Sequence, residues 1–288
     1  MYPPVAPTIS LGPLTLTWYG LFMATAVITG AWIASKEIER RGKDPEDFWD
    51  MLIWVLLPAF FGARLYYVFI QSGNAAYYLA NPLQVLMIWT GGIHIFGAFI
   101  FGSIALWLFT KIRRLPTLTY LDAAAVGLPI AQAIGRWGNF INQELYGPPT
   151  DWPLGLRIDA NRRLPPYDAT IPPNCGPINP PNCDLAYPVE TTRFHALFLY
   201  ESVWNLLGFL VLYFVSKRLG RKLRPGDLSL LYLVWYPFGR FFIEFLRTDS
   251  WFFPGTPFNV VHVLSLVAIV GAVATLVLRR RLGKAITN

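Results

Sequence analysis

The sequence predicts an all-α, polytopic membrane protein with about seven transmembrane helices, and three observations lead to this prediction. Hydrophobic residues make up 54% of the chain and charged residues only 14%, whereas a soluble domain carries about 25% charged residues. Apolar segments long enough to cross a bilayer recur along the whole chain. Basic residues collect in every second loop between these segments. We therefore interpret residues 1–288 as a single transmembrane domain.

The apolar segments define the predicted helices, with boundaries good to a few residues. They cover roughly residues 14–35, 49–70, 83–110, 119–140, 195–216, 228–247 and 258–278. The first thirteen residues lack a basic region and an Ala-x-Ala cleavage site, so we expect no removable signal peptide.

The distribution of basic residues predicts the orientation in the membrane. They follow the first, third, fifth and seventh segments, for example at Lys36, Lys111, Arg218 and Arg280, whereas residues 71–81 contain none. By the positive-inside rule, the N-terminus lies outside and the C-terminus in the cytoplasm. Anionic lipid of the inner leaflet accounts for the net charge of +7, and we expect no nucleic-acid partner.

A proline-rich insertion at about residues 148–193 interrupts the apolar pattern on the predicted outer side. Such a composition is typical of extended or irregular chain rather than of a packed domain. The insertion holds both cysteines of the protein, Cys175 and Cys183, and a disulfide between them is plausible outside the membrane. We do not expect either cysteine to be catalytic, because neither has a base beside it.

The strongest cluster of polar residues is the run from Gly135 to Glu144, at the end of the fourth segment. If the run is helical, Arg136, Asn139 and Gln143 share one face. Charged residues at membrane depth usually face a cavity and serve a function, and this set suits an anionic head group. The alternative is a polar helix end that packs against other helices.

Two further helices carry spaced polar residues. Tyr236, Arg240 and Glu244 step by four residues in the sixth segment and therefore share a face. An internal salt bridge between the arginine and the glutamate is the alternative, and both interpretations can hold together. In the fifth segment, Glu201 shares a face with Asn205.

An arginine also lies deep in the second segment, at Arg64, where its side chain cannot easily reach the interface. We expect it to pair with Asp122 or with a lipid phosphate. Asp122 stands at the start of the fourth segment, where an acid also favours the helix dipole, so a capping role is equally open.

The run from Gly135 to Glu144 resembles the signature of bacterial prolipoprotein diacylglyceryl transferases, Gly-Arg-x-Gly-Asn-Phe-x-Asn-x-Glu, at every fixed position. The resemblance extends over the first six segments. It includes Trp18-Tyr19-Gly20, the Gly-x-Arg-x-x-Tyr spacing around Arg64, and the pattern Tyr236-x-x-x-Arg240-x-x-x-Glu244-x-x-Arg247.

The third segment departs from this family. Many members carry a histidine, treated as a catalytic base, where this chain has Phe96. His94 lies two positions earlier, which is about 200° around a helix, so it cannot replace that histidine on the same face. Either the local backbone is irregular or the chemistry does not need this imidazole.

The resemblance implies transfer of the diacylglyceryl group of phosphatidylglycerol to the lipobox cysteine of a prolipoprotein, in the bacterial cytoplasmic membrane. It implies these two substrates as partners, and we expect no cofactor and no metal. The implied catalytic residues are Tyr19, Arg136, Asn139, Glu201, Arg240 and Glu244. The implied phosphatidylglycerol-binding residues are Arg64, Arg136, Asn142, Glu144, Tyr236 and Arg240. A transporter or scramblase of anionic phospholipid is the alternative function, although the paired repeats typical of transporters are not visible.

Overall fold

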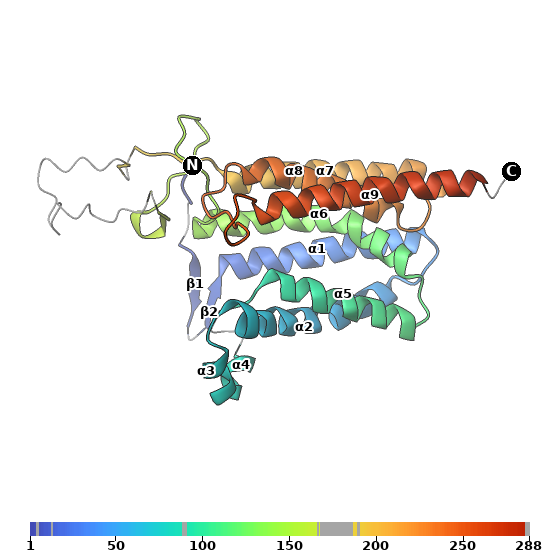
Figure 1. Ribbon diagram of the computed structural model, residues 1–288, viewed down its shortest axis with the longest axis horizontal. Helices are drawn as coiled ribbons and strands as arrows, with labels where there is room; N and C mark the ends of the chain where they lie inside the picture. The colour runs from blue at the N-terminus through green and yellow to red at the C-terminus, as the bar shows by residue number, and fades with distance from the viewer. Residues whose placement is uncertain are drawn as a thin grey trace, which may run out of the picture. The chain divides into compact units, whose positions relative to one another are not determined.

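The computed structural model describes residues 1–3, 6–12, 14–87, 91–165, 167, 187–188 and 191–285 (Figure 1). The predicted disulfide between Cys175 and Cys183 falls outside these residues. The described elements, in chain order, are β1 (Thr8–Leu11), β2 (Leu14–Thr17), α1 (Trp18–Arg40), α2 (Glu46–Tyr66) with a π-helical turn (Tyr67–Gln71), α3 (Ala75–Ala80), α4 (Pro82–Leu86), α5 (Ile95–Ile112), α6 (Thr117–Asn142), a 3-10 turn (Ala160–Arg162), α7 (Leu197–Leu219), a second 3-10 turn (Gly220–Lys222), α8 (Asp227–Glu244) and α9 (Val260–Ala285).

The predicted all-α membrane fold is confirmed. Among the described residues, six helices are long and apolar enough to cross a membrane, namely α1, α2 with its π-helical turn, α5, α6, α7 and α9. The remaining predicted span, residues 228–247, is helical as α8. Because α8 carries Asp227, Arg240 and Glu244, its length and composition alone do not identify it as a span. That α8 is a seventh span stays a prediction.

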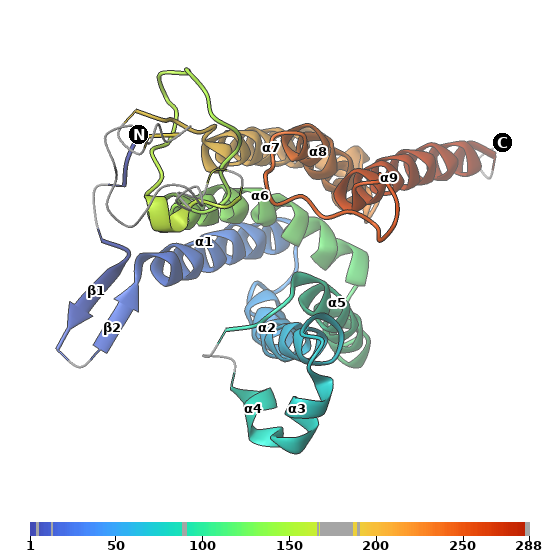
Figure 2. The ribbon, with the colours of Figure 1, turned by 60° about the vertical axis from the view of Figure 1, so that its left-hand side comes forward.

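Two of the predicted segments have different boundaries in the structure. The first helix begins at Trp18 rather than at residue 14, because Leu14–Thr17 pairs with Thr8–Leu11 as an antiparallel hairpin (Figure 2). Leucine and threonine alternate in β2, and this period of two favours a strand over a helix.

The third predicted segment, residues 83–110, is not one helix. α4 ends at Leu86 and α5 begins at Ile95, and the described residues between them are not helical. Gly91 and Gly92 have φ angles of 83° and 72°, which a right-handed helix does not use. The local backbone is therefore irregular, as one of the two alternatives for His94 required.

The chain divides into two compact units. The unit of residues 31–124 is built on α2 and α5. A Cβ atom on Gly97 would overlap the carbonyl group of Gly62, so the two helix backbones are in direct contact. A core that includes Ile38, Met51 and Tyr120 fills the rest of this unit.

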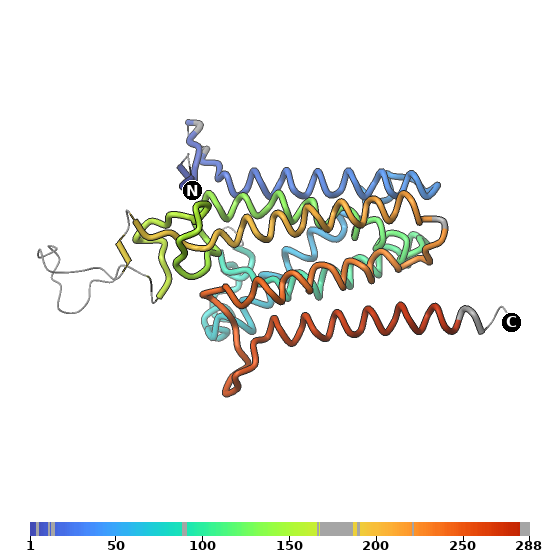
Figure 3. The backbone as a smooth tube through the Cα atoms, turned by 90° about the horizontal axis from the view of Figure 1, so that it is seen from above, coloured from blue at the N-terminus to red at the C-terminus, as the bar shows by residue number. Residues whose placement is uncertain are grey.

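The other unit, residues 1–30 and 125–288, contains α6 from residue 125 onward, α7, α8, α9 and the start of α1. α8 lies between α7 and α9 (Figure 3). Ser202 of α7 donates a hydrogen bond to the carbonyl oxygen of Ala133 in α6 at 2.9 Å. α6, α7 and α8 therefore form a connected group, and this group carries most of the predicted site.

A small core covers the ends of α6 and α7 that lie near the insertion. Its members are Phe140, Ile141, Tyr146, Leu156, Ile158, Phe194, Ala196 and Phe198. The described part of the insertion is irregular, as predicted, with isolated bridges and one 3-10 turn. It nevertheless contributes the fully buried side chains of Leu156 and Ile158, so this part is anchored to the helix ends.

Candidate active site

The end of α6 folds the Glu144 carboxylate back over the helix. α6 ends at Asn142, and Gln143 and Leu145 both take left-handed φ angles, of 56° and 55°. Asn142 donates to Glu144 Oε1 at 2.9 Å, and Asn139 donates to Glu144 Oε2 at 3.3 Å. The turn therefore brings both asparagines and the acid of the run 135–144 into one network.

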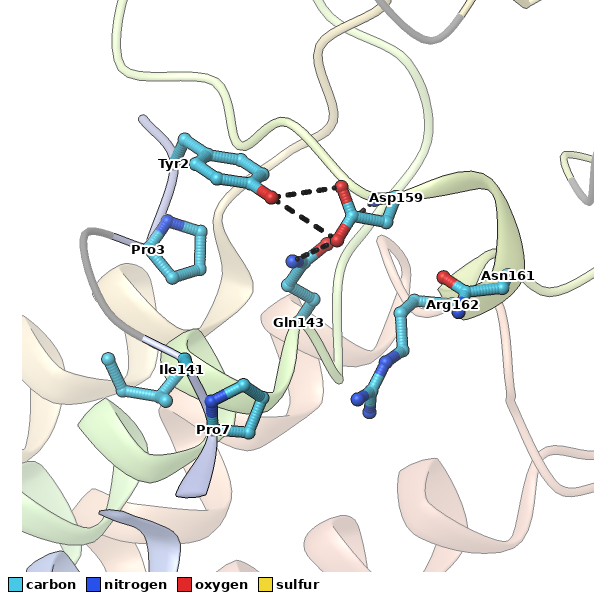
Figure 4. Close-up of a pocket in the computed structure, with 9 residues that line it drawn as sticks. Tyr2, Pro3, Pro7, Ile141, Gln143, Asp159, Asn161 and Arg162 are labelled. Atoms are coloured by element: carbon cyan, nitrogen blue, oxygen red, sulfur yellow. Dashed lines mark hydrogen bonds between the residues drawn. The ribbon is translucent and has the colours of Figure 1, made fainter. Parts of the chain in front are cut away.

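Gln143 does not share in that network, which corrects the prediction that it faces the same way as Arg136. Its amide donates to Asp159 Oδ2 at 2.8 Å, and its oxygen accepts from the backbone N–H of Asp159 at 2.7 Å. These residues border a separate cavity of about 360 Å³, also lined by Tyr2 and Arg162 (Figure 4). The helix periodicity no longer applies at Gln143 because the backbone has already left the helix.

The carboxylate of Glu201 joins two arginines from different helices. Its Oε2 atom contacts Nε of Arg136 on α6, and its Oε1 atom accepts from Arg240 on α8 at 3.1 Å. Glu201 is 4% exposed, so this acid is removed from solvent. A buried carboxylate between two guanidinium groups fixes the positions of both, and removing it would leave Arg136 without this carboxylate and Arg240 with one carboxylate in place of two.

The ionic network continues along α8 to the loop that follows. The second amino group of Arg240 contacts Glu244 Oε2 at 2.6 Å. Arg247 lies 3.9 Å from the same oxygen and pairs with Asp249 at 2.6 Å. Both the predicted salt bridge and the predicted common face of Arg240 and Glu244 are thus present in the structure.

A reciprocal pair of tryptophans sets the register of α7 against α8. Trp204 Nε1 donates to the carbonyl oxygen of Trp235, and Trp235 Nε1 donates to that of Trp204, both at 3.1 Å. The rings stack with centroids 4.6 Å apart. Each ring lies over a glycine of the facing helix, Trp204 over Gly239 and Trp235 over Gly208. This packing fixes the height at which Arg240, the next residue after Gly239, meets Glu201.

The two predicted tyrosines, Tyr19 and Tyr236, lie near the ionic network of Arg136, Glu201 and Arg240, and each is held there by a different packing contact. Tyr19, at the start of α1, packs against Gly138, where a Cβ atom would come within 2.8 Å of the tyrosine ring. Tyr236 lies one turn before Arg240 on α8 and stacks on Tyr232 with ring centroids 5.7 Å apart. The arrangement therefore combines cations, carboxylates and aromatic hydroxyl groups on adjacent helices.

Two arginines held in fixed positions by buried carboxylates are suited to a phosphate group. A guanidinium carries five N–H donors, and the carboxylates of Glu201 and Glu244, together with Asn139 Oδ1 at 3.4 Å from Arg136, occupy only part of those of Arg136 and Arg240. Arginine also stays charged when it is buried, and its planar fork matches phosphate oxygens.

Comparison with known proteins decides the family. A model of the family described as prolipoprotein diacylglyceryl transferase matches residues 4–278. The chain belongs to this family. It is 40% identical over 289 residues to the phosphatidylglycerol–prolipoprotein diacylglyceryl transferase of Chloroflexus aggregans, covering 94% of this chain and 88% of that relative. The relatives of the same name from Enterococcus faecalis and Streptococcus agalactiae are 39% and 37% identical, over 92% and 98% of this chain and 86% and 97% of their own lengths.

In this diacylglyceryl transferase, Arg64 belongs to the unit of residues 31–124 and is 3% exposed. Its guanidinium donates to the carbonyl oxygens of Gln84, Val85, Gly91 and Gly92. Asp122, one of the two partners expected for Arg64, instead contacts Arg41 at 3.3 Å. Arg64 therefore holds the irregular segment before α5 by its backbone.

The transferase has Phe96 in the first turn of α5 and His94 at the position just before the helix. His94 has an extended backbone, and its Nδ1 atom accepts from the backbone N–H of Phe96 at 3.4 Å. Its ring stacks on Tyr66 with centroids 5.0 Å apart. These contacts describe a helix cap packed on an aromatic ring.

Two residues of the network were not anticipated from the sequence. Ser250 Oγ and Asn259 Nδ2 both donate to Glu244 Oε1, each at 3.0 Å. Small polar residues are common in loops, and nothing in their spacing connects them to α8. Only the folded chain brings them to the carboxylate.

Proposed function

We propose that this transferase moves the diacylglyceryl group of phosphatidylglycerol to the thiol of the lipobox cysteine in a prolipoprotein. The observation that carries the proposal is the buried Glu201 carboxylate, which holds Arg136 and Arg240 together from two different helices. The names of the relatives support the same two substrates. The proposed location is the bacterial cytoplasmic membrane, with the site reached from the outer side.

The reaction needs a negative charge stabilised on the leaving group. The sulfur of the cysteine attacks the diacylglyceryl carbon that bears the phosphate oxygen, a C–S bond forms, and the C–O bond breaks. Its electron pair leaves with glycerol phosphate, which gains charge as it departs. Fixed donors directed at such a group commonly lower the barrier by about 3–4 kcal/mol. Arg136 and Arg240 are the proposed donors.

The thiol must also lose its proton, which passes to solvent or to an oxygen of the departing glycerol phosphate, because the thiolate is the nucleophile and a free cysteine has a pKa near 8.5. A cationic environment favours the thiolate, and the same two arginines provide one. In this proposal, Asn139, Asn142, Glu144 and the two tyrosines orient the head group and the arginines.

The test is direct transfer in a defined system. The purified protein is incubated with phosphatidylglycerol and a peptide that contains a lipobox, and the peptide is analysed by mass spectrometry. We expect the mass to increase by one diacylglyceryl group on the cysteine, with no increase on a peptide in which serine replaces that cysteine. Movement of phosphatidylglycerol between leaflets without any modified peptide would contradict the proposal and favour a scramblase.

A further inference from the structure

The loop between α8 and α9 presents a group of aromatic side chains to the outside of the molecule. We call residues 250–259 the aromatic hairpin. Trp251, Phe252, Phe253 and Phe258 are 47%, 49%, 40% and 63% exposed. The sequence from Trp251 to Phe258 contains no charged residue. Water is a poor solvent for such a surface, so an apolar partner is expected to cover it.

The aromatic hairpin has a defined shape. The backbone N–H of Phe253 donates to the carbonyl oxygen of Phe258 at 3.0 Å, and that of Val260 donates to Trp251 at 2.9 Å. Gly255 turns the tip with a φ angle of 72°, a conformation that favours glycine. The backbone therefore holds the rings in place by its own hydrogen bonds.

Its position points to the membrane interface. α8 ends at Glu244 and the apolar helix α9 begins at Val260, so the aromatic hairpin lies at the end of a candidate span. Arginines 279–281 lie at the opposite end of α9, where the positive-inside rule places the cytoplasm. Tryptophan and other aromatic residues concentrate where a span leaves the hydrocarbon.

Both ends of the aromatic hairpin are fastened to one buried oxygen atom. Ser250 and Asn259 donate to Glu244 Oε1, while Glu244 Oε2 holds Arg240 at 2.6 Å. Glu244 and Asn259 are 2% and 5% exposed. A displacement of the aromatic hairpin therefore acts on the carboxylate that positions Arg240.

We propose that the aromatic hairpin inserts into the interfacial region of the outer phospholipid leaflet and, through Ser250, Asn259 and Glu244, links contact with lipid to the position of Arg240. Its partner is the layer of head groups and upper acyl chains from which the lipid substrate comes. Ser250 and Asn259 are positioning residues in this scheme. The part that concerns Arg240 rests on the function proposed above, whereas insertion into lipid does not.

Insertion is tested with a fluorescent probe on the full chain. In a Cys175→Ser, Cys183→Ser background, Phe258→Cys is labelled with bimane, and Asn161→Cys, exposed on the insertion, is the matched control. Both proteins are placed in vesicles of phosphatidylcholine and phosphatidylglycerol. We expect lipids with a nitroxide near the head group to quench the probe at position 258, and aqueous iodide to quench the control. Iodide quenching at both positions would overturn the proposal, whether or not the protein has transferase activity.

Coupling to Arg240 is tested by steady-state kinetics against the surface concentration of phosphatidylglycerol. Trp251→Ser with Phe252→Ser should raise KM about tenfold, because apolar area is lost at the interface, and should also lower kcat, because the hairpin no longer steadies Glu244 and, through it, Arg240. The matched pair Trp251→Phe with Phe252→Leu should retain the wild-type KM. Asn259→Ala should instead lower kcat about tenfold or more while the probe at position 258 stays in lipid. An unchanged kcat in Asn259→Ala would show that the aromatic hairpin and Arg240 are independent.

Discussion

Arg240 of α8 donates to Glu201 of α7 at 3.1 Å, and the same carboxylate also contacts Arg136 of α6. One buried acid thus determines where two cations from two further helices stand. Such a network stabilises the fold only while each buried charge has its partner, because a buried charge that loses its partner is strongly destabilising.

Glu201→Gln is the most direct test of this dependence. The amide keeps the shape of the side chain but removes the negative charge that Arg136 contacts and one of the two negative charges that hold Arg240. We expect the free energy of unfolding to fall by about 3–5 kcal/mol, as for other broken buried pairs, and turnover to fall with it. Thermal unfolding in detergent measures the first quantity. Glu39→Gln is the control, because the pair of Glu39 with Lys36 is more than half exposed and should change stability by less than about 1 kcal/mol.

The two arginines should not tolerate replacement by lysine. Arg136→Lys and Arg240→Lys keep the charge but lose the planar set of donors that spans several acceptors. We expect transferase turnover to fall about a hundredfold to a thousandfold in each variant. Arg113→Lys serves as the control, since its pair with Asp50 is half exposed and should leave turnover unchanged.

His94→Ala and Phe96→Ala distinguish a phosphate clamp from catalysis by an imidazole. His94 caps α5 and stacks on Tyr66, so its loss should cost about 1 kcal/mol of stability and little turnover. Phe96 carries no proton and should act through packing alone. Near-normal rates in both arginine variants together with an inactive, folded His94→Ala would mean that the imidazole, and not the arginines, drives the reaction.

Gly239→Ala should disturb the site without touching any charged group. A Cβ atom there would overlap the ring of Trp204, so the helices must move apart or the tryptophan pair must open. We expect a loss of about 1–3 kcal/mol of stability and a clear loss of turnover. Gly271→Ala on α9 meets nothing within 4 Å and should be neutral or slightly stabilising. Equal behaviour of the two variants would show that the tryptophan packing does not set the position of Arg240.

The orientation in the membrane is testable with reporter fusions. The alternation of basic loops predicts that a reporter after Asn161 lies outside and that one after Arg114 lies in the cytoplasm. A phosphatase reporter, active only outside, should be active at the first site and inactive at the second. The reverse pattern would invert the topology and place the site on the cytoplasmic side.

The sequence was informative where the chain follows a regular period. The common face of Tyr236, Arg240 and Glu244 follows from a spacing of four residues, and α8 keeps that spacing throughout. The contact between Glu201 and Arg136 could not be predicted in this way, because it depends on how α6 and α7 pack. The clustering of the polar residues suggested a shared site but not which atoms meet.

The structure differs from the helical patterns in the sequence at positions where the backbone is not helical. Gln143 would share the face of Arg136 if the run stayed helical, but α6 ends at Asn142, and Gln143, with a φ angle of 56°, donates to Asp159 instead. The segment at residues 83–110 was delimited by its apolar character as one span, and the irregular backbone that remained an alternative near His94 is what the structure has at Gly91 and Gly92. The hydrophobicity of a segment does not indicate such local changes of φ, because an apolar residue adds the same amount to the mean hydropathy whether its backbone is helical or not.

The anchoring of Arg64 has a consequence for how this region can vary in evolution. Its four described hydrogen bonds end on main-chain oxygens, which every amino acid possesses. Gly91 and Gly92 are restricted by their own φ angles, whereas Gln84 and Val85 can be exchanged without removing an acceptor. Two transferases can therefore keep the same hydrogen bonds from this arginine although the side chains at the positions of Gln84 and Val85 differ completely.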